Sequence, residues 1–218
     1  MDRAGLASII DHTLLAPDAT PGQIAMFCGE ATALGVGAVC VSPNRLPLPA
    51  RALAAGMGTV AVVGFPSGAH RRELKAAEAA QAVADGATEV DVVIDLGLAA
   101  AGLWSRIADD LGVVRAALPS PVVLKVIIEA AALDHDAIVA ACQAAEDAGA
   151  DFVKTSTGFH SAGGASLADV ELMAATVDGR LGVKAAGGIR DARTALAMVD
   201  AGATRLGCSA TRAILDGL

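Results

Sequence analysis

One short junction recurs along this chain and constrains its fold more than any other feature. An alanine-rich run of helical composition ends in a glycine and is followed at once by β-branched or apolar residues. The clearest copies are ADGATEVDVV (84–93), EDAGADFVK (146–154) and VDAGATRLG (199–207). Glycine is expected just past a helix because that position often needs a positive φ, which costs glycine nothing. The repeat therefore predicts helices that alternate with strands.

Eight segments are predicted strands, and the segments between them have helical composition and periodicity. The strands are SIID (8–11), GAVCVS (37–42), TVAVVGF (59–65), TEVDVVID (88–95), PVVLKVII (121–128), DFVKTS (151–156), LGVKAA (181–186) and TRLGCS (204–209). Strands alternating with helices indicate βα units, a parallel sheet and right-handed crossovers. Eight such units in 218 residues match a closed barrel. We predict an α/β fold, a single-domain (β/α)8 TIM barrel over residues 1–218.

The alternative is an open, doubly wound sheet. That fold favours a glycine-rich dinucleotide-binding turn after an early strand, and GFPSG (64–68) is a poor match to that turn.

Charged side chains share one face of the predicted strand 88–95. Side chains alternate across a strand, so Val90, Val92 and Ile94 fall on one face. The other face carries Glu89, Asp91, Val93 and Asp95. The aliphatic face must pack under the outer helices, which leaves the carboxylates pointing into the barrel.

The placement of the lysines points to chemistry. The sequence has only four lysines against twelve arginines, and Lys125, Lys154 and Lys184 lie in or at the end of strands five, six and seven. The fourth, Lys75, is predicted on a solvated helix. Buried charges are costly unless paired, so we predict Asp91 as the shared counter-ion of the three strand lysines. A purely structural ion cluster is the alternative interpretation.

Lysine can lose its proton and become a nucleophile, whereas arginine stays charged. Two amines ~5 Å apart on neighbouring strands repel by ~3 kcal/mol at an effective dielectric of ~20. That repulsion raises the neutral fraction of one amine near neutral pH about a hundredfold. Desolvation acts in the same direction and Asp91 opposes it. We interpret Lys154 as a nucleophile and Lys184 as the cation that activates it.

Two glycine-bearing turns follow the last two predicted strands. Gly187 and Gly188 precede a predicted helix, with Arg190 nearby, and Gly207 and Ser209 follow the same pattern after strand eight. Backbone N–H groups at such turns face anions, and barrel enzymes commonly hold phosphate after strands seven and eight. We predict a phosphate site there.

Composition excludes several partners. The net charge is -8, aromatic residues make up 2 % and tyrosine is absent, so nucleic acid and anionic membranes are poor partners. The N-terminus lacks a signal-peptide pattern. The four cysteines form no C-x-x-C pair and suit a reducing compartment. We expect a soluble, cytoplasmic protein, and the sequence permits a monomer or a homo-oligomer, either dimer or tetramer.

Eight short motifs, taken together and in chain order, resemble those of a known family. In chain order they are IDHTLL (10–15), VCVSP (39–43), VGFPSG (63–68), EVDVV (89–93), LKVIIE (124–129), VKTSTGF (153–159), VKAAGGIR (183–190) and RLGCS (205–209). The chain closely resembles the deoxyribose-phosphate aldolases, a family of class I aldolases, from about residue 9 to 210. The resemblance implies a barrel that interconverts 2-deoxy-D-ribose 5-phosphate with acetaldehyde and D-glyceraldehyde 3-phosphate, without metal or cofactor.

The resemblance also implies roles for particular residues. Lys154 forms the Schiff base, Lys184 is the neighbouring cation, and Asp91 belongs to the proton relay. The residues that match the phosphate-binding loops are Gly158, Gly187, Gly188, Arg190 and Ser209. The residues expected to line the pocket in supporting roles are Asp11, Cys40, Lys125 and Thr155, with Lys125 expected to act as a partner of Asp91 and not on the substrate itself.

Three positions depart from the family pattern. Phe159 stands where certain relatives carry a phosphate-binding lysine, Ala210 replaces the second serine of a Ser-Ser pair, and Ala130 stands where threonine is frequent. These departures affect phosphate affinity and leave the Schiff-base centre intact. Two other functions stay open: a barrel isomerase that works by acid/base transfer at Asp91, and a catalytically silent barrel that binds a sugar phosphate.

Overall fold

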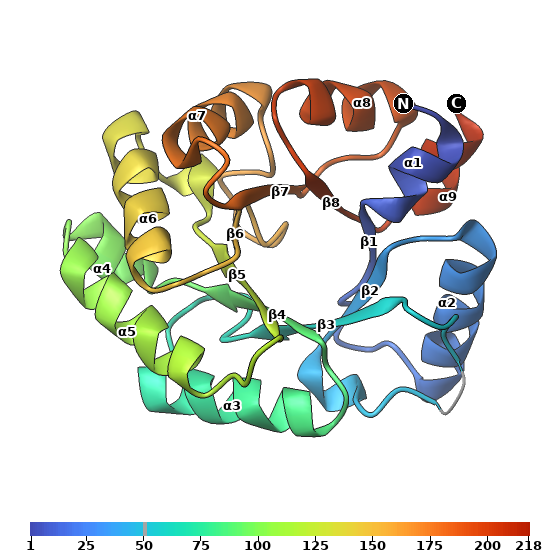
Figure 1. Ribbon diagram of the computed structural model, residues 1–218, viewed down its shortest axis with the longest axis horizontal. Helices are drawn as coiled ribbons and strands as arrows, with labels where there is room; N and C mark the ends of the chain where they lie inside the picture. Colours follow the sequence, from blue (N-terminus) through green and yellow to red (C-terminus); the bar gives the residue numbers. More distant parts are fainter. Residues whose placement is uncertain (50–51) are drawn as a thin grey trace.

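A computed structural model, which describes residues 1–49 and 52–218, has eight parallel strands closed into a barrel. The strands follow chain order around the ring, and β1 closes the barrel by pairing with β8 (Figure 1). The strands are β1 (Ile10–Leu14), β2 (Ala38–Val41), β3 (Gly58–Val63), β4 (Glu89–Val93), β5 (Val123–Ile127), β6 (Phe152–Lys154), β7 (Gly182–Ala186) and β8 (Arg205–Cys208). The predicted (β/α)8 barrel is confirmed, and the open sheet is excluded.

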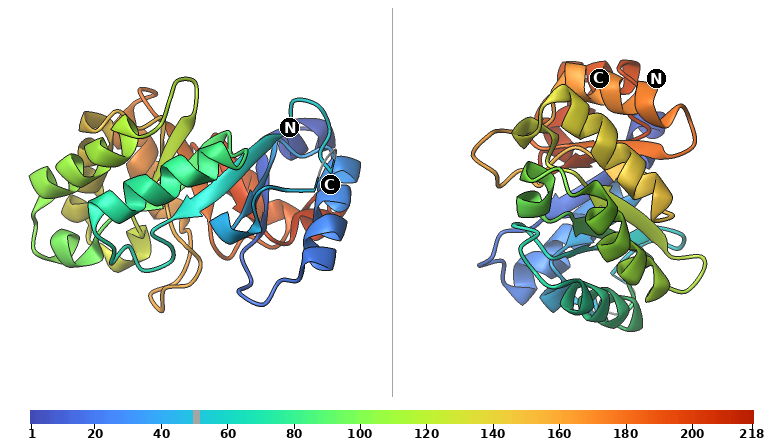
Figure 2. Two further views of the ribbon diagram at one scale, coloured as in Figure 1. Left: turned by 90° about the horizontal axis from the view of Figure 1, so that it is seen from below. Right: turned by 90° about the vertical axis from the view of Figure 1, so that its left-hand side faces the viewer.

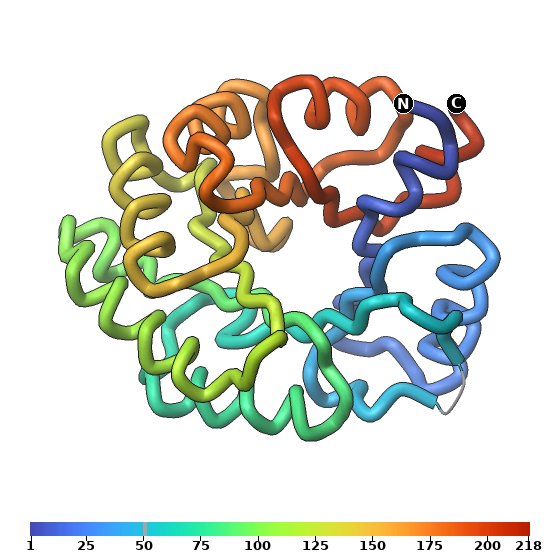
Figure 3. The backbone as a smooth tube through the Cα atoms, viewed as in Figure 1, coloured from blue at the N-terminus to red at the C-terminus, as the bar shows by residue number. Residues whose placement is uncertain are grey.

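Helices cover the outside of the ring, as Figures 1 and 3 show. They are α1 (Arg3–Ser8), α2 (Pro21–Leu34), α3 (Arg72–Ala84), α4 (Leu96–Ala100), α5 (Trp104–Ala116), α6 (His135–Asp147), α7 (Leu167–Val177), α8 (Ala192–Asp200) and α9 (Thr211–Asp216), with 3-10 turns at η1 (Pro43–Arg45) and η2 (Ala130–Ala132). Polar caps fix several helix starts; Asp191 accepts a hydrogen bond from the Thr194 N–H at the start of α8. The side views in Figure 2 show the helices stacked along the barrel wall.

The alternation along each strand separates an apolar outer layer from a mixed interior. On β4, Val90 and Val92 are fully buried in the large core between sheet and helices, while Asp91 is buried inside the barrel. Next to β4 the interior is apolar, with Cys40, Val60 and Val62 packed together. The interior therefore has an apolar side and a charged side, and the charged side lies on the strands that carry the lysines.

Strand register places the charged residues next to one another. Asp91 on β4 is the partner of Lys125 on β5, and Lys154 on β6 is the partner of Lys184 on β7. Lys184 is in turn the partner of Arg205 on β8. In a parallel sheet such partners point to the same face. The register thus brings five charged side chains to one side of the barrel interior.

Two local expectations differ from the structure. The first strand begins at Ile10, because residues up to Ser8 belong to α1, which Asp2 caps. A helix is expected between β2 and β3, as between the other strands, but the described residues of this connection contain only the turn η1. Pro47 and Pro49 lie in this connection, and proline lacks the N–H that a helix interior needs.

Among the described helices, none has the length and apolar composition to span a membrane.

Candidate active site

The three strand lysines share one carboxylate inside the barrel. Lys154 Nζ and Lys184 Nζ donate to the same oxygen, Asp91 Oδ2, at 2.8 Å and 2.7 Å. Lys125 Nζ donates to the other oxygen, Oδ1, at 2.8 Å. Asp91, Lys125 and Lys184 are 0 % exposed. The predicted shared counter-ion is confirmed, and the amines of Lys154 and Lys184 face the same side of the sheet.

A second layer of charge lies around these residues. Asp11 on β1 accepts hydrogen bonds from Lys184 Nζ and, at 2.5 Å, from Arg205 Nε. Arg205 Nη2 also donates to Glu89 Oε1 at 2.9 Å. Lys125 Nζ lies 2.5 Å from Glu89 Oε2, as an ion pair that lacks the alignment of a hydrogen bond. The lysines are thus part of a continuous network of buried charge.

The network fixes the charge of its members. Burial alone would raise the pKa of Asp91, but the positive charges of Lys125, Lys154 and Lys184 outweigh it and hold that pKa well below its usual range. Burial would lower the pKa of Lys184, yet Asp11 and Asp91 raise it well above its ordinary value. Asp91 therefore stays anionic and Lys184 stays cationic across the physiological range.

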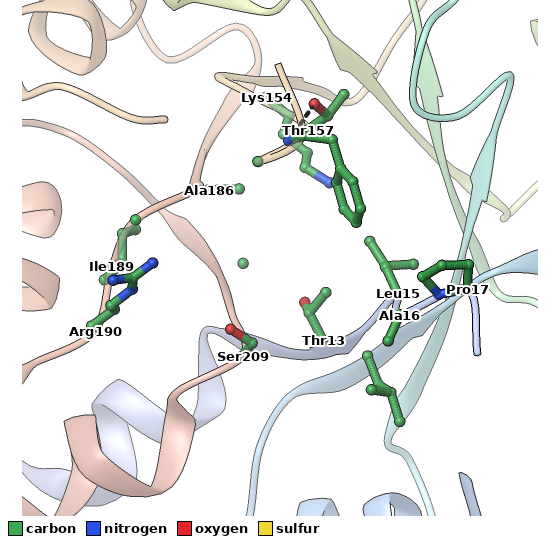
Figure 4. A pocket seen from close by; sticks show the side chains of 16 residues that line it. Thr13, Leu15, Ala16, Pro17, Lys154, Thr157, Ala186, Ile189, Arg190 and Ser209 are labelled. Carbon is green, nitrogen blue, oxygen red and sulfur yellow. Dashed lines mark hydrogen bonds between the residues drawn. The ribbon is translucent and has the colours of Figure 1, made fainter. Parts of the chain in front are cut away.

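A pocket of about 510 Å³ opens above this network (Figure 4). In Figure 4, Arg190 and Ser209 lie on one side of it and Leu15 and Pro17 on the other, with Lys154 between them. The predicted residues that line it are Lys154, Gly158, Gly187, Gly188, Arg190, Gly207 and Ser209. The fold therefore gathers every residue of the predicted phosphate site, together with the predicted nucleophile, around one cavity.

The four predicted supporting residues do not line the pocket. Asp11, Cys40, Lys125 and Thr155 are all 0 % exposed and lie beneath the lining residues. Thr155 holds β6 to β7, because its hydroxyl donates to the Ala186 carbonyl and accepts from the Ala186 N–H, both at 3.0 Å. Of the predicted catalytic residues, Asp91 and Lys184 are likewise buried below the pocket. Lys154, with a side chain 4 % exposed, is the lysine of this network that lines the cavity.

Glycines bring two pocket loops into contact. A Cβ on Gly164 would lie 2.3 Å from the Gly187 carbonyl oxygen, and one on Gly187 would lie 2.9 Å from the Gly164 Cα. Gly187 and Gly188 also have positive φ, of 92° and 82°. Only glycine allows this approach without strain. The loop after β6 therefore packs backbone to backbone against the loop after β7, where the anion site is predicted.

Lys75 was predicted on a solvated surface, and this is wrong. Lys75 is 4 % exposed, and its Nζ donates to the Val93 carbonyl at the end of β4 at 2.7 Å. Its aliphatic stem lies against Gly64, where a Cβ would be 2.9 Å from the lysine Cε. A helix that packs on the sheet can bury a long side chain along its stem and pair the amine with a free strand-end carbonyl. Burial accordingly lowers the pKa of Lys75.

Sequence reasoning missed two residues that shape the site, the partly buried Arg205 and the buried Glu129. Arg205 bridges Asp11 and Glu89, and the alternation of TRLGCS, which places it on the same face as Gly207, was the signal for it. Glu129 is 0 % exposed at a φ of 55°, and it accepts hydrogen bonds from the N–H and, at 2.6 Å, the hydroxyl of Thr157, which lines the pocket. No local pattern predicts a glutamate in the left-handed region.

We expect the protein to lose stability in acid. Asp11 has a pKa of about 2 in the folded protein against an ordinary 3.8, because Lys184, Lys125 and Arg205 outweigh burial. A carboxyl whose folded pKa is depressed adds stability above its unfolded pKa and loses it as the pH falls through the folded one. The free energy of unfolding in urea should therefore be constant above about pH 5 and fall steadily between about pH 4 and pH 2.

The exposed Asp136 offers a matched control. An Asp136→Asn variant should show the same fall in acid as the natural protein, because its carboxylate is fully exposed. A free energy of unfolding that stays level from about pH 5 to pH 2 would contradict the described network.

The chain is similar to known proteins over nearly its whole length. A family model described as DeoC/LacD family aldolase matches residues 6–217. The chain is 61 % identical over 216 residues to a deoxyribose-phosphate aldolase of Kocuria rhizophila, covering 99 % of this chain and 98 % of that protein. It is 58 % identical over 220 residues to one of Mycobacterium avium, with the same coverage. A tetrameric deoxyribose phosphate aldolase of Aeropyrum pernix has a TM-score of 0.89 at 33 % identity, covering 99 % of this chain and 91 % of that one.

Proposed function

The chain belongs to the DeoC/LacD family of aldolases, and from this premise we propose how its buried lysines carry out the reaction. The reaction is that of a lyase: the reversible cleavage of 2-deoxy-D-ribose 5-phosphate to acetaldehyde and D-glyceraldehyde 3-phosphate. We assign the Schiff base to Lys154. One observation carries this assignment: the amine of Lys154 faces the pocket while it shares an oxygen of Asp91 with the cationic amine of Lys184.

The proposed mechanism begins with addition of the lysine to the aldehyde. Neutral Lys154 attacks C1 of the open-chain sugar, and loss of water gives an iminium. The iminium accepts the electron pair of the C2–C3 bond as the 3-hydroxyl loses its proton, which releases glyceraldehyde 3-phosphate and leaves an enamine on Lys154. Protonation of the enamine carbon and hydrolysis then release acetaldehyde and restore the amine.

The buried network supplies what this sequence needs. Lys184 places a positive charge next to the amine of Lys154, because both amines donate to Asp91 Oδ2. Asp91, kept anionic, orients both amines and stabilises the iminium charge as it forms. In the proposed proton relay, Asp91 and Lys184 act together with water in the pocket, because the strongly acidic carboxyl alone is a weak base.

The phosphate is proposed to lie at the glycine turns. Gly187, Gly188 and Ser209 flank the pocket on the side of Arg190, whose guanidinium is the charged group among the lining residues on that side. Phe159 also lines the pocket, is 54 % exposed and packs edge-on to Phe65 with ring centroids 5.2 Å apart. Phosphate recognition here therefore relies on Arg190 and backbone amides, with no lysine at position 159.

The direct test of the function is an assay for acetaldehyde. The purified protein should release acetaldehyde and glyceraldehyde 3-phosphate in equal amounts from 2-deoxy-D-ribose 5-phosphate. Release of an isomeric sugar phosphate without acetaldehyde would support an acid/base isomerase instead. Tight binding of the ester without turnover would support the silent barrel.

Glu129 yields a prediction about substrate binding. The Thr157 hydroxyl, which donates to Glu129, also accepts the Phe159 N–H at 3.0 Å, so the glutamate holds the loop that carries Gly158. Glu129→Ala should raise the KM for the phosphate ester about tenfold, the size of one lost hydrogen bond to a charged group, with a smaller change in kcat.

Glu129→Gln is the matched control in the same kinetics, because an amide oxygen can still accept from the Thr157 hydroxyl. It should recover most of the lost affinity. A KM that is unchanged in both variants would show that the loop holds its shape without Glu129.

Three further points are part of the proposal. The tetramer described for the Aeropyrum pernix relative supports a homo-oligomer of this chain. A cytoplasmic location is supported by four free, buried cysteines. The closed barrel built from both ends of the chain supports a single domain over residues 1–218.

A further inference from the structure

Seven charged side chains form one contact network inside the barrel, which we call the interior ion cluster. Its members are Asp11, Glu89, Asp91, Lys125, Lys154, Lys184 and Arg205. Four of them are 0 % exposed, Lys154 is 3 % exposed, and the side chains of Glu89 and Arg205 are only 12 % and 18 % exposed. Bulk water therefore screens the cluster poorly.

The charges in the cluster do not balance when all members are ionised. It contains three carboxylates and four cationic side chains, so one positive charge remains. An uncompensated buried charge is unfavourable, and the cluster can remove it by releasing one proton. Arg205 cannot release one, because a guanidinium stays protonated in proteins.

Lys154 is the member that can release the proton. Lys125 and Lys184 are 0 % exposed and contact three and two carboxylates of the cluster, whereas Lys154 hydrogen-bonds only Asp91 within it. Lys154 also lines the pocket, so its proton has a path to solvent. The cluster reaches zero net charge when Lys154 is a neutral amine, which is the form that attacks an aldehyde.

Glu89 and Arg205 contribute to this balance from a distance. They pair with each other at 2.9 Å and contact Lys125 and Asp11, and neither of them touches Lys154 or lines the pocket. We propose that Glu89 and Arg205 are positioning residues that set, through the net charge of the interior ion cluster, the fraction of Lys154 present as the nucleophilic amine. This proposal rests on the proposed function of Lys154.

Groups from every neighbouring element enter this balance. Those facing Lys154 across the interior are Asp11 from β1, Cys40 from β2, Asp91 from β4, Lys125 from β5, Lys184 from β7 and Arg205 from β8. Burial raises the pKa of Cys40, so this thiol stays neutral. β3 contributes Val60 and Val62, and on the pocket side Arg190 is exposed. The net charge around Lys154 in the barrel interior therefore comes from the members of the interior ion cluster.

Two variants with opposite charge changes test the proposal. Both are assayed by the dependence of kcat/KM for 2-deoxy-D-ribose 5-phosphate on pH, whose acid limb reports ionisation in the free enzyme. Glu89→Gln makes the cluster more positive, so the neutral amine forms more readily and the acid limb should move to lower pH. Arg205→Gln removes the surplus charge, so the limb should move to higher pH. Each shift should be about one pH unit, as for a unit charge roughly 10 Å away at an effective dielectric of about 20.

Controls separate charge from structure. Arg205→Lys keeps the charge and should restore the natural midpoint. Glu146→Gln and Arg180→Gln make the same charge changes in an exposed pair and should leave the midpoint in place. If Arg205→Gln does not fold, Glu89→Gln alone tests the proposal. A shift of its acid limb to lower pH supports the proposal, and no shift or a shift to higher pH overturns it.

The outcomes are distinct. Opposite shifts of the two cluster variants support the proposal. No shift, or shifts in the same direction, overturns it while the assignment of Lys154 stands. Absence of acetaldehyde release by the natural protein at every pH would instead defeat the proposed function, and the inference with it.

Discussion

Replacing Lys154 by arginine should abolish aldol cleavage and leave the barrel folded. The expected loss of turnover is at least about 10,000-fold, because a guanidinium forms no iminium and the covalent step is lost entirely. Arginine places a positive charge beside Asp91 Oδ2, which Lys154 contacts at 2.8 Å, so the buried carboxylate keeps a cationic partner at this position. Acetaldehyde release measures the loss, and circular dichroism confirms the fold.

Lys125→Arg is the matched control for this substitution. Lys125 lies one strand away and contacts the same carboxylate, but the mechanism assigns it no bond to the substrate. We expect that variant to retain at least about a hundredfold more turnover than Lys154→Arg. Turnover of Lys154→Arg within tenfold of the natural enzyme would contradict a covalent role for Lys154 and favour acid/base catalysis.

Replacing Asp91 by asparagine should have the second largest effect. Asp91 is the carboxylate that Lys125, Lys154 and Lys184 share inside the barrel. Removing one partner of a buried ion pair leaves charge uncompensated, so the free energy of unfolding should fall by about 3–5 kcal/mol. Turnover should fall by at least about a hundredfold, because both amines lose the group that orients them. Urea denaturation and the acetaldehyde assay measure the two effects.

Glu146→Gln provides the control for stability. Glu146 pairs with Arg180 on the surface, where both side chains are substantially exposed. Such pairs contribute at most about 1 kcal/mol. A loss in Asp91→Asn no larger than in this control would show that the strand lysines do not depend on Asp91 for their charge.

The barrel and the catalytic face could be predicted because both follow from strong periodic signals. The glycine junctions mark where each helix ends and the next strand begins, and a period of two assigns every strand residue to a face. An all-aliphatic row such as Val90 and Val92 leaves little choice about which face carries Asp91. The three lysines on successive strands then had to meet the nearest carboxylate, and the contacts confirm it.

Depth and backbone conformation were harder to predict. Alternation gives the face of a residue but not its distance from the pocket, so Asp11 was expected to line the pocket and lies beneath it. Lys75 was assigned to solvent because its helix is rich in charge, whereas its burial depends on the end of β4 lying within reach of its amine. Glu129 depends on tertiary contacts that hold a non-glycine residue at positive φ.

The most direct test of the account is chemical trapping of the proposed iminium. The protein is incubated with acetaldehyde, reduced with borohydride, digested and analysed by peptide mass. We predict an ethyl group on Lys154, with Lys125 and Lys184 unmodified because both are fully buried and held by carboxylates. An unmodified Lys154, whether the label lies on another lysine or on none, would contradict the claim that this amine is the nucleophile.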